Sequence, residues 1–183
     1  IVIVPVDLTV SGPKLSVVPT SVEFVAAPNE PNVGGQILTI RNSGGGSLNW
    51  EVTGANDCNW LSVYPLTGQS RGEVNEVTIT VDPCNLALGF YDCQFTISDP
   101  NATSSPTTVN VSLHVRIPGE LHVPVEYSTI QSALNAAVAG ETVVLQPGSY
   151  DEGINIPAKD TTITSSDPHD PNVVADTILD GGG

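Results

Sequence analysis

The chain has 183 residues, of which 20 are acidic and 5 are basic, giving a net charge of −15. This length predicts one or two domains. The few Lys and Arg residues exclude a nucleic-acid-binding protein, since phosphates need them, and disfavour anionic membrane surfaces. No apolar run approaches the ~18 residues of a membrane-spanning helix. Because the sequence has no Met, we expect either that its N-terminus is processed or that it is an excerpt of a longer chain; any export signal has then been removed or lies outside it.

The first ten residues, IVIVPVDLTV, alternate apolar side chains in the period of a half-buried strand. The run TTVNVSLHV at 107–115 alternates in the same way. Aligning Val10 with Val115 gives an offset of 115 − 10 = 105, and Pro13 and Pro118 are also 105 apart. Residues 1–11 are therefore predicted to be the last strand of a preceding sandwich repeat, or a strand donated to another copy.

Residues 12–117 carry seven or eight short alternating strands, which is typical of an immunoglobulin-like two-sheet sandwich. Tyr91 stands two residues before Cys93 at a strand start, which predicts a tyrosine corner. Gly-rich residues 41–47 predict a flexible turn. The expected strands are 15–18, 22–26, 37–40, 48–52, 60–63, 77–81, 91–97 and 107–115.

Three cysteines are present, Cys58, Cys84 and Cys93, and none forms a CxxC motif. A turn-rich all-β chain fits an oxidising compartment, so one disulfide and one spare thiol is the simplest count. Cys58 follows the Trp50 strand and Cys93 lies in the strand expected beside it, which favours Cys58–Cys93. Cys84 is the rival partner or the free thiol, because connectivity does not follow from sequence.

Two aromatic residues are candidates for carbohydrate binding, Trp60 and Tyr64, because aromatic faces stack on sugar rings. The alternative is plain packing: Leu61 and Val63 occupy the same short strand, so one of its faces must be buried. Trp50 shares a strand face with Leu48 and is expected in the core.

The pattern changes after Pro118. Ile130, Ala133, Leu134, Ala137 and Val138 fall on one helical face, which predicts a helix at about 129–139, with Ser128 and Gln131 as a capping box and Gly140 at its end. Short β-rich runs follow at 142–145, 154–156, 161–164 and 177–179. Strands this short are expected as the faces of a coil, each pairing with the next turn.

No cofactor and no metal site is predicted. The loop Asp167–Asn172 offers oxygens for Ca²⁺, but its Asp, Pro and Asn residues favour an ordinary turn, and the D-x-D-x-D-G spacing is missing. Asp151 and Glu152 are strand neighbours that point to opposite faces, so they do not form a glycosidase dyad. No catalytic residue is predicted.

The segments PTSVEF (19–24), CNWLSVYPLTG (58–68), GEVNEVTITVD (72–82) and LALGFYDCQFTISDPN (86–101) resemble a BACON domain, and the likeness covers about residues 12–117. BACON domains are immunoglobulin-like modules of secreted bacterial proteins. The resemblance therefore implies an extracellular or cell-surface location, and a role in carbohydrate or mucin adhesion or as a spacer.

The segment VPVEYSTIQSALNAAVAGETVVLQPGSYDEGINI, with DPNVVADTILDGG after it, resembles the opening of a pectate-lyase-like right-handed parallel β-helix. The likeness covers about residues 121–183, within a domain expected at 118–183. It implies a cap helix followed by the first coils. In catalytic members of that family the reacting residues lie on later coils, so none is carried over to this chain.

The functional hypothesis is a non-catalytic structural or adhesive module of a larger surface protein, assembling head-to-tail into arrays or filaments. Its partners are then other copies or neighbouring domains, bound through strand 1–10 and the open end of the coil. The alternative is a carbohydrate-binding module attached to a polysaccharide-processing β-helix, with glycans as ligands. A third hypothesis makes the parent a polysaccharide lyase or hydrolase.

Overall fold

The structure, a computed structural model, describes residues 11–31 and 33–181, so the prediction for residues 1–10 lies outside the described part. The chain divides into two compact units. The first comprises the described parts of residues 1–24, 32–82 and 92–113. The second comprises residues 25–31, 83–91 and the chain from 114 onward. Each unit is described separately.

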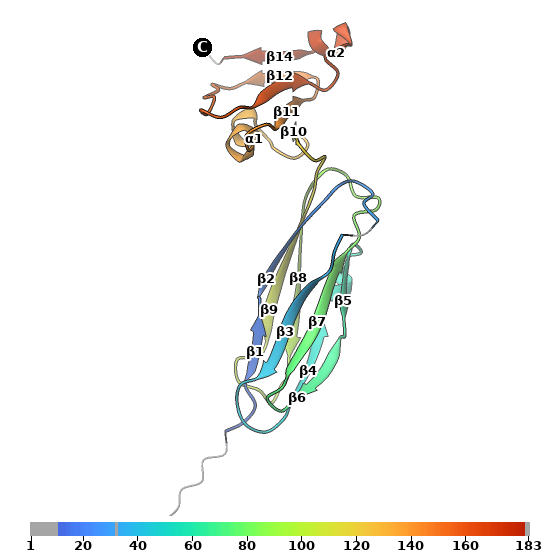
Figure 1. Ribbon diagram of the computed structural model, residues 1–183, viewed down its shortest axis with the longest axis vertical. Helices are drawn as coiled ribbons and strands as arrows, with labels where there is room; N and C mark the ends of the chain where they lie inside the picture. Colours follow the sequence, from blue (N-terminus) through green and yellow to red (C-terminus); the bar gives the residue numbers. More distant parts are fainter. Residues whose placement is uncertain (1–10, 32, 182–183) are drawn as a thin grey trace, which may run out of the picture. The chain divides into compact units, whose positions relative to one another are not determined.

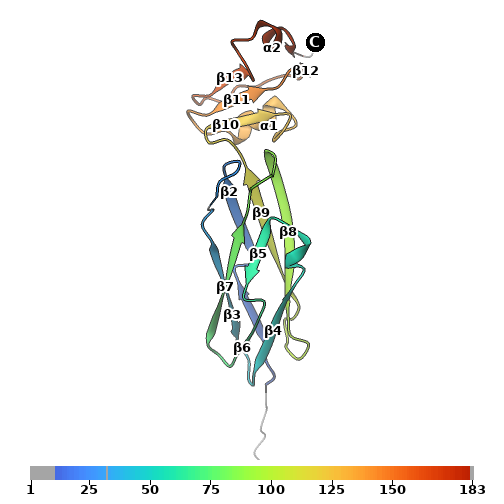
Figure 2. The same ribbon diagram turned by 90° about the vertical axis from the view of Figure 1, so that its right-hand side faces the viewer.

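The first unit is centred on a two-sheet sandwich of mostly antiparallel strands (Figures 1 and 2), which confirms the predicted immunoglobulin-like class. One sheet has the order β1-β3-β7-β5 and the other β2-β9-β8-β4-β6. Their bounds are β1 Leu15–Val18, β2 Ser21–Ala26, β3 Gln36–Asn42, β4 Leu48–Thr53, β5 Leu61–Tyr64, β6 Thr67–Ser70, β7 Val74–Val81, β8 Gly89–Ser98 and β9 Thr107–Val115. A 3-10 turn, η1 Ala55–Asp57, follows β4.

Alternating apolar residues of both sheets fill the space between them, as the sequence pattern predicts. The fully buried members include Leu38, Ile40, Val77 and Ile79 from one sheet and Phe95, Ile97, Val111 and Leu113 from the other. Strand β6 is missing from the predicted set because its sequence, TGQS, has no apolar alternation. It forms by pairing with β4 rather than by its own pattern.

Trp50 lies in the core, as predicted, where one neighbour accepts its indole hydrogen bond and another leaves space for its ring. Its Nε1 donates a hydrogen bond to Asn75 Oδ1 at 2.8 Å, so the buried donor is satisfied. Gly68 stands directly opposite Trp50 in the β4–β6 pair. A Cβ atom on Gly68 would lie 2.2 Å from Trp50 Cζ2, so only glycine leaves room for the ring.

The Gly-rich turn at 41–47 is tied down rather than flexible, which differs from the prediction. Buried Asn42 accepts hydrogen bonds at Oδ1 from the backbone N–H groups of Lys14 and Gly44, both at 3.0 Å. Its Nδ2 donates to the carbonyls of Gly45 and Gly46. One amide side chain therefore closes the turn and links it to the start of β1.

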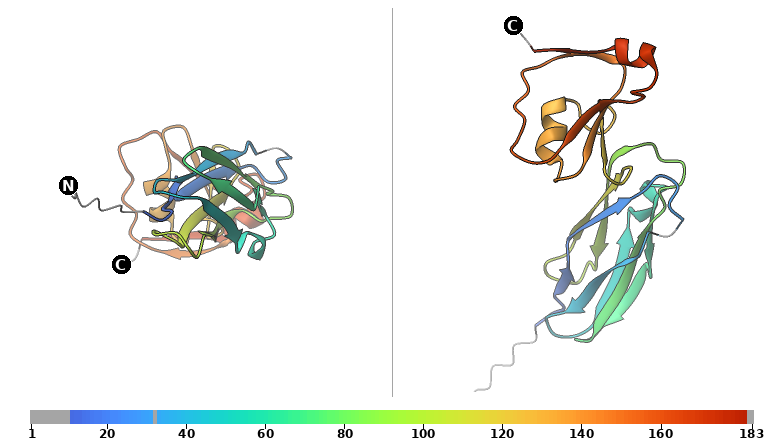
Figure 3. Two further views of the ribbon diagram at one scale, coloured as in Figure 1. Left: turned by 90° about the horizontal axis from the view of Figure 1, so that it is seen from below. Right: turned by 45° about the horizontal axis from the view of Figure 1, so that its top comes forward.

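The second unit contains short parallel strands in register (Figures 1 and 3). One sheet has the order β10-β11-β13 and a second pairs β12 with β14. Glu120 pairs with Thr142, and Thr142 pairs with Thr162. The successive strands of this parallel stack, here called rungs, therefore start 142 − 120 = 22 and 162 − 142 = 20 residues apart. The bounds are β10 Glu120–Val123, β11 Thr142–Leu145, β12 Gly148–Asp151, β13 Thr162–Ser165 and β14 Thr177–Asp180.

Several predictions for this unit need correction. Helix α1 spans Ile130–Ala136 and its capping box is Thr129 with Ser132, not Ser128 with Gln131. The helix ends before Val138, which is 63% exposed rather than part of the buried face. Residues 154–156 form no strand, and β10 and β12 were not predicted. A second short helix, α2, spans Pro171–Ala175.

Helix α1 is held at both ends by the chain that follows it. Glu152 Oε1 and Oε2 accept hydrogen bonds from the backbone N–H groups of Ile130 and Gln131, at 2.8 and 3.1 Å. Lys159 Nζ donates to the carbonyls of Asn135 and Ala137 at the other end. A negative charge at the N-terminus of a helix and a positive charge at its C-terminus both stabilise it, because each lies next to the opposite end of the helix dipole.

The core of this unit lies between α1 and the strands β10 and β11. Its fully buried members are Leu121, Val123, Ile130, Ala133, Leu134, Val143 and Leu145. Tyr150 packs against this cluster and its hydroxyl donates to the Val123 and Gln146 carbonyls, at 3.2 and 2.7 Å. Burial raises the pKa of Tyr150 above its ordinary value, so the phenol stays a neutral donor.

We predict that Gly68→Ala destabilises the sandwich by about 1–3 kcal/mol, since the added methyl overlaps the Trp50 ring. Chemical denaturation followed by tryptophan fluorescence measures the change. Gly34→Ala is the matched control, because no atom lies within 4 Å of its Cβ position. An unchanged midpoint for Gly68→Ala would contradict the close contact.

We predict that Glu152→Ala lowers the stability of the second unit by about 2 kcal/mol, because two charge-assisted hydrogen bonds to the start of α1 are lost. Amide hydrogen exchange of residues 130–136 measures local opening. Asp151→Ala removes the same charge one residue away without touching α1, and its exchange pattern should match the parent chain.

Candidate functional site

The two aromatic residues predicted for carbohydrate binding have different environments. Trp60 is only 7% exposed, so it offers no free ring face, which agrees with the packing alternative for this residue. It lies just before β5 rather than on its outer face, and is buried together with Leu61. Tyr64, at the end of β5, is 78% exposed. Tyr64 is therefore the one member of the predicted pair with a ring available for stacking.

Tyr64 belongs to a row on the outer face of the four-stranded sheet. The register pairs Tyr64 with Thr78 of β7, and Thr78 with Ile37 of β3. All three side chains are exposed, Ile37 at 53%. An aromatic ring, a hydroxyl and an aliphatic side chain thus stand side by side on a flat sheet face, which suits a weakly polar, ring-shaped ligand.

The disulfide is Cys58–Cys93, the pairing that the sequence favours, with a Cα–Cα distance of 6.3 Å. It joins the segment after η1 to β8. Cys84 lies outside the bridge and is exposed. The tyrosine corner is also present, because Tyr91 Oη donates to the Ala87 carbonyl at 2.9 Å.

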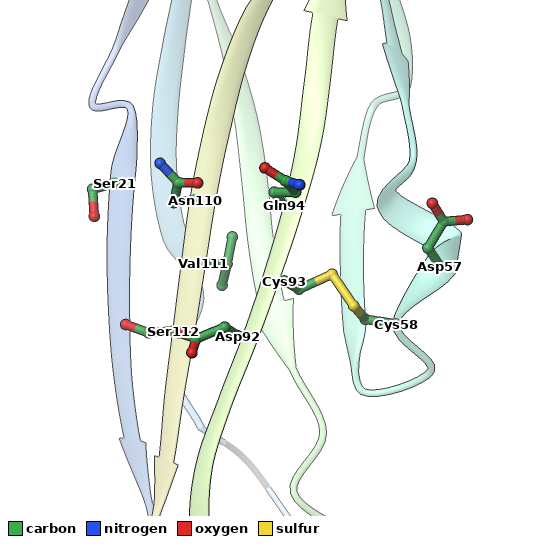
Figure 4. A pocket seen from close by; sticks show the side chains of 9 residues that line it. All are labelled: Ser21, Asp57, Cys58, Asp92, Cys93, Gln94, Asn110, Val111 and Ser112. Carbon is green, nitrogen blue, oxygen red and sulfur yellow. A yellow bond between two sulfur atoms is a disulfide. The ribbon is translucent and has the colours of Figure 1, made fainter.

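A hollow of about 620 Å³ lies beside this disulfide, within the first unit (Figure 4). Polar side chains reach it from four places: η1, β8, β9 and β2. These are Asp57, Asp92, Gln94, Asn110, Ser112 and Ser21. The sequence analysis missed them, although the outward alternation of Asp92 with Gln94, and of Asn110 with Ser112, was the available signal.

The chemistry of the hollow favours neutral, hydroxyl-rich ligands. Its lining has carboxylates, amides and hydroxyls but neither Lys nor Arg, so it disfavours anions. Within residues 11–31 and 33–181, no hydrogen bond engages the side chains of Asp92, Gln94 or Asn110. These groups are therefore available to a ligand. Buried Trp60 lies outside the lining.

The last rungs of the second unit form a different kind of surface. β13 and β14 are the outer strands of their sheets in the described chain. Ile178 and Leu179 are 53% and 49% exposed, and Val174 is 48% exposed. A hollow of about 490 Å³, lined by Leu145, Ile163, Thr164, Ser165, Pro168, Val174, Thr177 and Leu179, lies beside them. Apolar side chains and open strand edges are thus exposed together.

The loop at 167–172 forms a turn, as favoured over Ca²⁺ binding. Asp167 Oδ1 accepts from the His169 N–H at 3.0 Å, and Asp170 Oδ1 accepts from the Asn172 N–H at 2.9 Å to cap α2. Across residues 11–31 and 33–181, no three His, Cys, Asp or Glu side chains gather to hold a metal ion. The same residues contain no helix long and apolar enough to cross a membrane.

The two-sheet sandwich and the inter-element disulfide define the first unit as an immunoglobulin-like module. The chain belongs to the family described as the viral BACON domain, which matches residues 14–115. The BACON resemblance is thereby confirmed at the level of the family. The description is viral, whereas the resemblance implied bacterial proteins, so a bacterial source stays a prediction. The comparison with curated proteins found no match.

Several solved structures are distantly similar to this chain. The human CEP192 PapD-like domain 7 is 14% identical with a TM-score of 0.46, covering 63% of this chain and 93% of that one. A Bacteroides ovatus GH5 xyloglucanase with a XXXG heptasaccharide is 17% identical, with a TM-score of 0.42, covering 70% and 26%. A Porphyromonas gingivalis W83 protein of unknown function is 19% identical, with a TM-score of 0.45, covering 75% and 59%. No functional conclusion is drawn from these likenesses.

We predict that replacing Cys58 and Cys93 together by Ser costs about 4 kcal/mol in unfolding free energy, from the loop entropy of a separation of 35 residues. Urea denaturation measures it. Cys84→Ser is the matched control and should lower the midpoint far less, because it removes a thiol without opening the bridge. Equal midpoints for both variants would contradict a stabilising role.

Proposed function

We propose that this chain is a non-catalytic structural or adhesive module of a larger extracellular surface protein. The observation that carries the proposal is the family match over residues 14–115, which falls on a disulfide-linked two-sheet sandwich. In the second unit, short parallel strands complete their backbone hydrogen bonds only through neighbouring strands, which supports pairing with further strands. The disulfide supports an oxidising, extracellular setting.

The proposal includes the assignment of residues 118–183 to the start of a pectate-lyase-like right-handed β-helix with α1 as its cap helix. In-register parallel pairing at spacings of 22 and 20 residues supports this assignment. A non-catalytic role is supported by Glu152, whose two carboxylate oxygens hold the start of α1 and are not free for acid–base chemistry. The whole parent's activity stays outside this proposal.

The test is association in solution. We expect light scattering to show a concentration-dependent increase in mass, because exposed strand edges and Ile178 pair with other edges. Ile178→Lys should reduce the association, whereas Val18→Lys, which charges a 61% exposed position on the sandwich, should not. A single monomeric mass at every concentration would contradict the proposed association between copies.

A second candidate function is carbohydrate binding by the sandwich. The exposed Tyr64 row and the polar hollow beside the disulfide both favour neutral, hydroxyl-rich ligands. We expect a glycan array to give ligands whose affinity falls about tenfold in Tyr64→Ala or Asn110→Ala, through the loss of one stacked ring or of one hydrogen bond to the ligand. Val18→Ala, on the same sheet as Tyr64, is the control. If no glycan on the array binds, carbohydrate binding by the sandwich is excluded as a function.

A further inference from the structure

The hollow beside the disulfide has a floor and a wall, both within the first unit. The floor is formed by three neighbouring strands, β2, β9 and β8. The wall is the end of η1, which the Cys58–Cys93 bridge ties to β8, and both cysteines line the hollow. Its volume of about 620 Å³ is typical of small-molecule sites, which measure about 300–1,000 Å³. Because a covalent bond holds wall and floor together, the site is formed before a ligand arrives.

A row of polar side chains crosses the floor from strand to strand. Ser21 of β2, Asn110 of β9 and Gln94 of β8 lie at about the same level along these strands (Figure 4). Neighbouring strands are about 4.8 Å apart, so the row is about 10 Å long, the length of a disaccharide unit. Hydroxyl and amide groups both donate and accept hydrogen bonds, as sugar hydroxyls do. The row therefore matches a short stretch of a glycan chain.

The strand order argues for a glycan and against a peptide as the ligand. Peptides that bind to sheets add as a further strand and need an open strand edge. β9 lies between β2 and β8, and β8 lies between β9 and β4, so the central and inner strands of the floor are paired on both sides. A ligand on this floor therefore meets side chains rather than open backbone groups.

Two carboxylates decide which charge the ligand carries. Asp92 faces outward from β8, as Gln94 does, and Asp57 lies on η1. In the part of the chain that the structure describes, neither side chain takes part in a hydrogen bond or an ion pair. The lining contains no Lys or Arg, and the net charge of −15 adds to the negative potential. Among hydroxyl-rich ligands, one with a positively charged group is thus favoured.

We propose that the hollow binds glycans that carry free amino groups, with Asp92 bound to an ammonium group and the row of Ser21, Asn110 and Gln94 bound to ring hydroxyls. The inference rests on carbohydrate binding, the second candidate function, and names the class of glycan. Figure 4 shows Asp92 at the level of Ser112 on the floor, whereas Asp57 lies beyond the disulfide. An N-acetylated sugar has an amide instead of the ammonium group and leaves Asp92 without a charged partner.

Titration calorimetry with two matched oligomers tests the proposal. A glucosamine tetramer and an N-acetylglucosamine tetramer have the same length and linkage and differ only in the acetyl groups. We expect the glucosamine tetramer to bind about tenfold more tightly, because only it forms a charge-assisted hydrogen bond with Asp92. Added NaCl should weaken the binding of the glucosamine tetramer and narrow this difference, since salt screens exposed charges.

Two variants separate Asp92 from the overall charge of the chain. Asp92→Asn keeps the shape of the side chain and should abolish the preference for the glucosamine tetramer. Glu51→Gln is the matched control, because Glu51 is an exposed carboxylate of the same sheet and lies outside the lining, and it should keep the preference. Both variants should unfold at the midpoint of the parent chain, since each changes only an exposed side chain.

Equal affinities for the two tetramers, or an unchanged preference in Asp92→Asn, would overturn the proposal and leave carbohydrate binding in place. Tetralysine that binds as tightly as the glucosamine tetramer would also overturn it, because charge alone would then account for binding. If neither tetramer binds while the glycan array yields other ligands, this inference fails and the second candidate function stands. If the array yields none, carbohydrate binding itself fails.

Discussion

The backbone hydrogen bonds of parallel rungs govern the second unit and the function proposed for it. A four-residue strand cannot satisfy its N–H and C=O groups within itself, so β10, β11 and β13 depend on one another in register. Helix α1 packs against the first of these strands, and its own ends are held by Glu152 and Lys159. Each of these short strands is therefore stable only together with its neighbours.

The sandwich does not depend on a stack of this kind for its stability. Its strands bury one face of each sheet in a shared core, and side chains such as Asn42 hold its turns in place. Its outer faces are then free to differ. One outer face carries Tyr64, Thr78 and Ile37, whereas the hollow beside the disulfide carries amides and carboxylates. A module with a self-sufficient core can present such surfaces without altering its fold.

Much of this architecture was predictable from sequence because strand alternation reports burial directly. The eight expected sandwich strands and the core position of Trp50 follow from that pattern. The Cys58–Cys93 bridge was only favoured, because the sequence left Cys84 as a rival partner. β6, β10 and β12 were not predicted, because TGQS, ELHV and GSYD lack clear alternation and form by pairing with neighbours. For Trp60 the sequence left packing and sugar binding open, because it precedes β5, where the strand period no longer assigns a face.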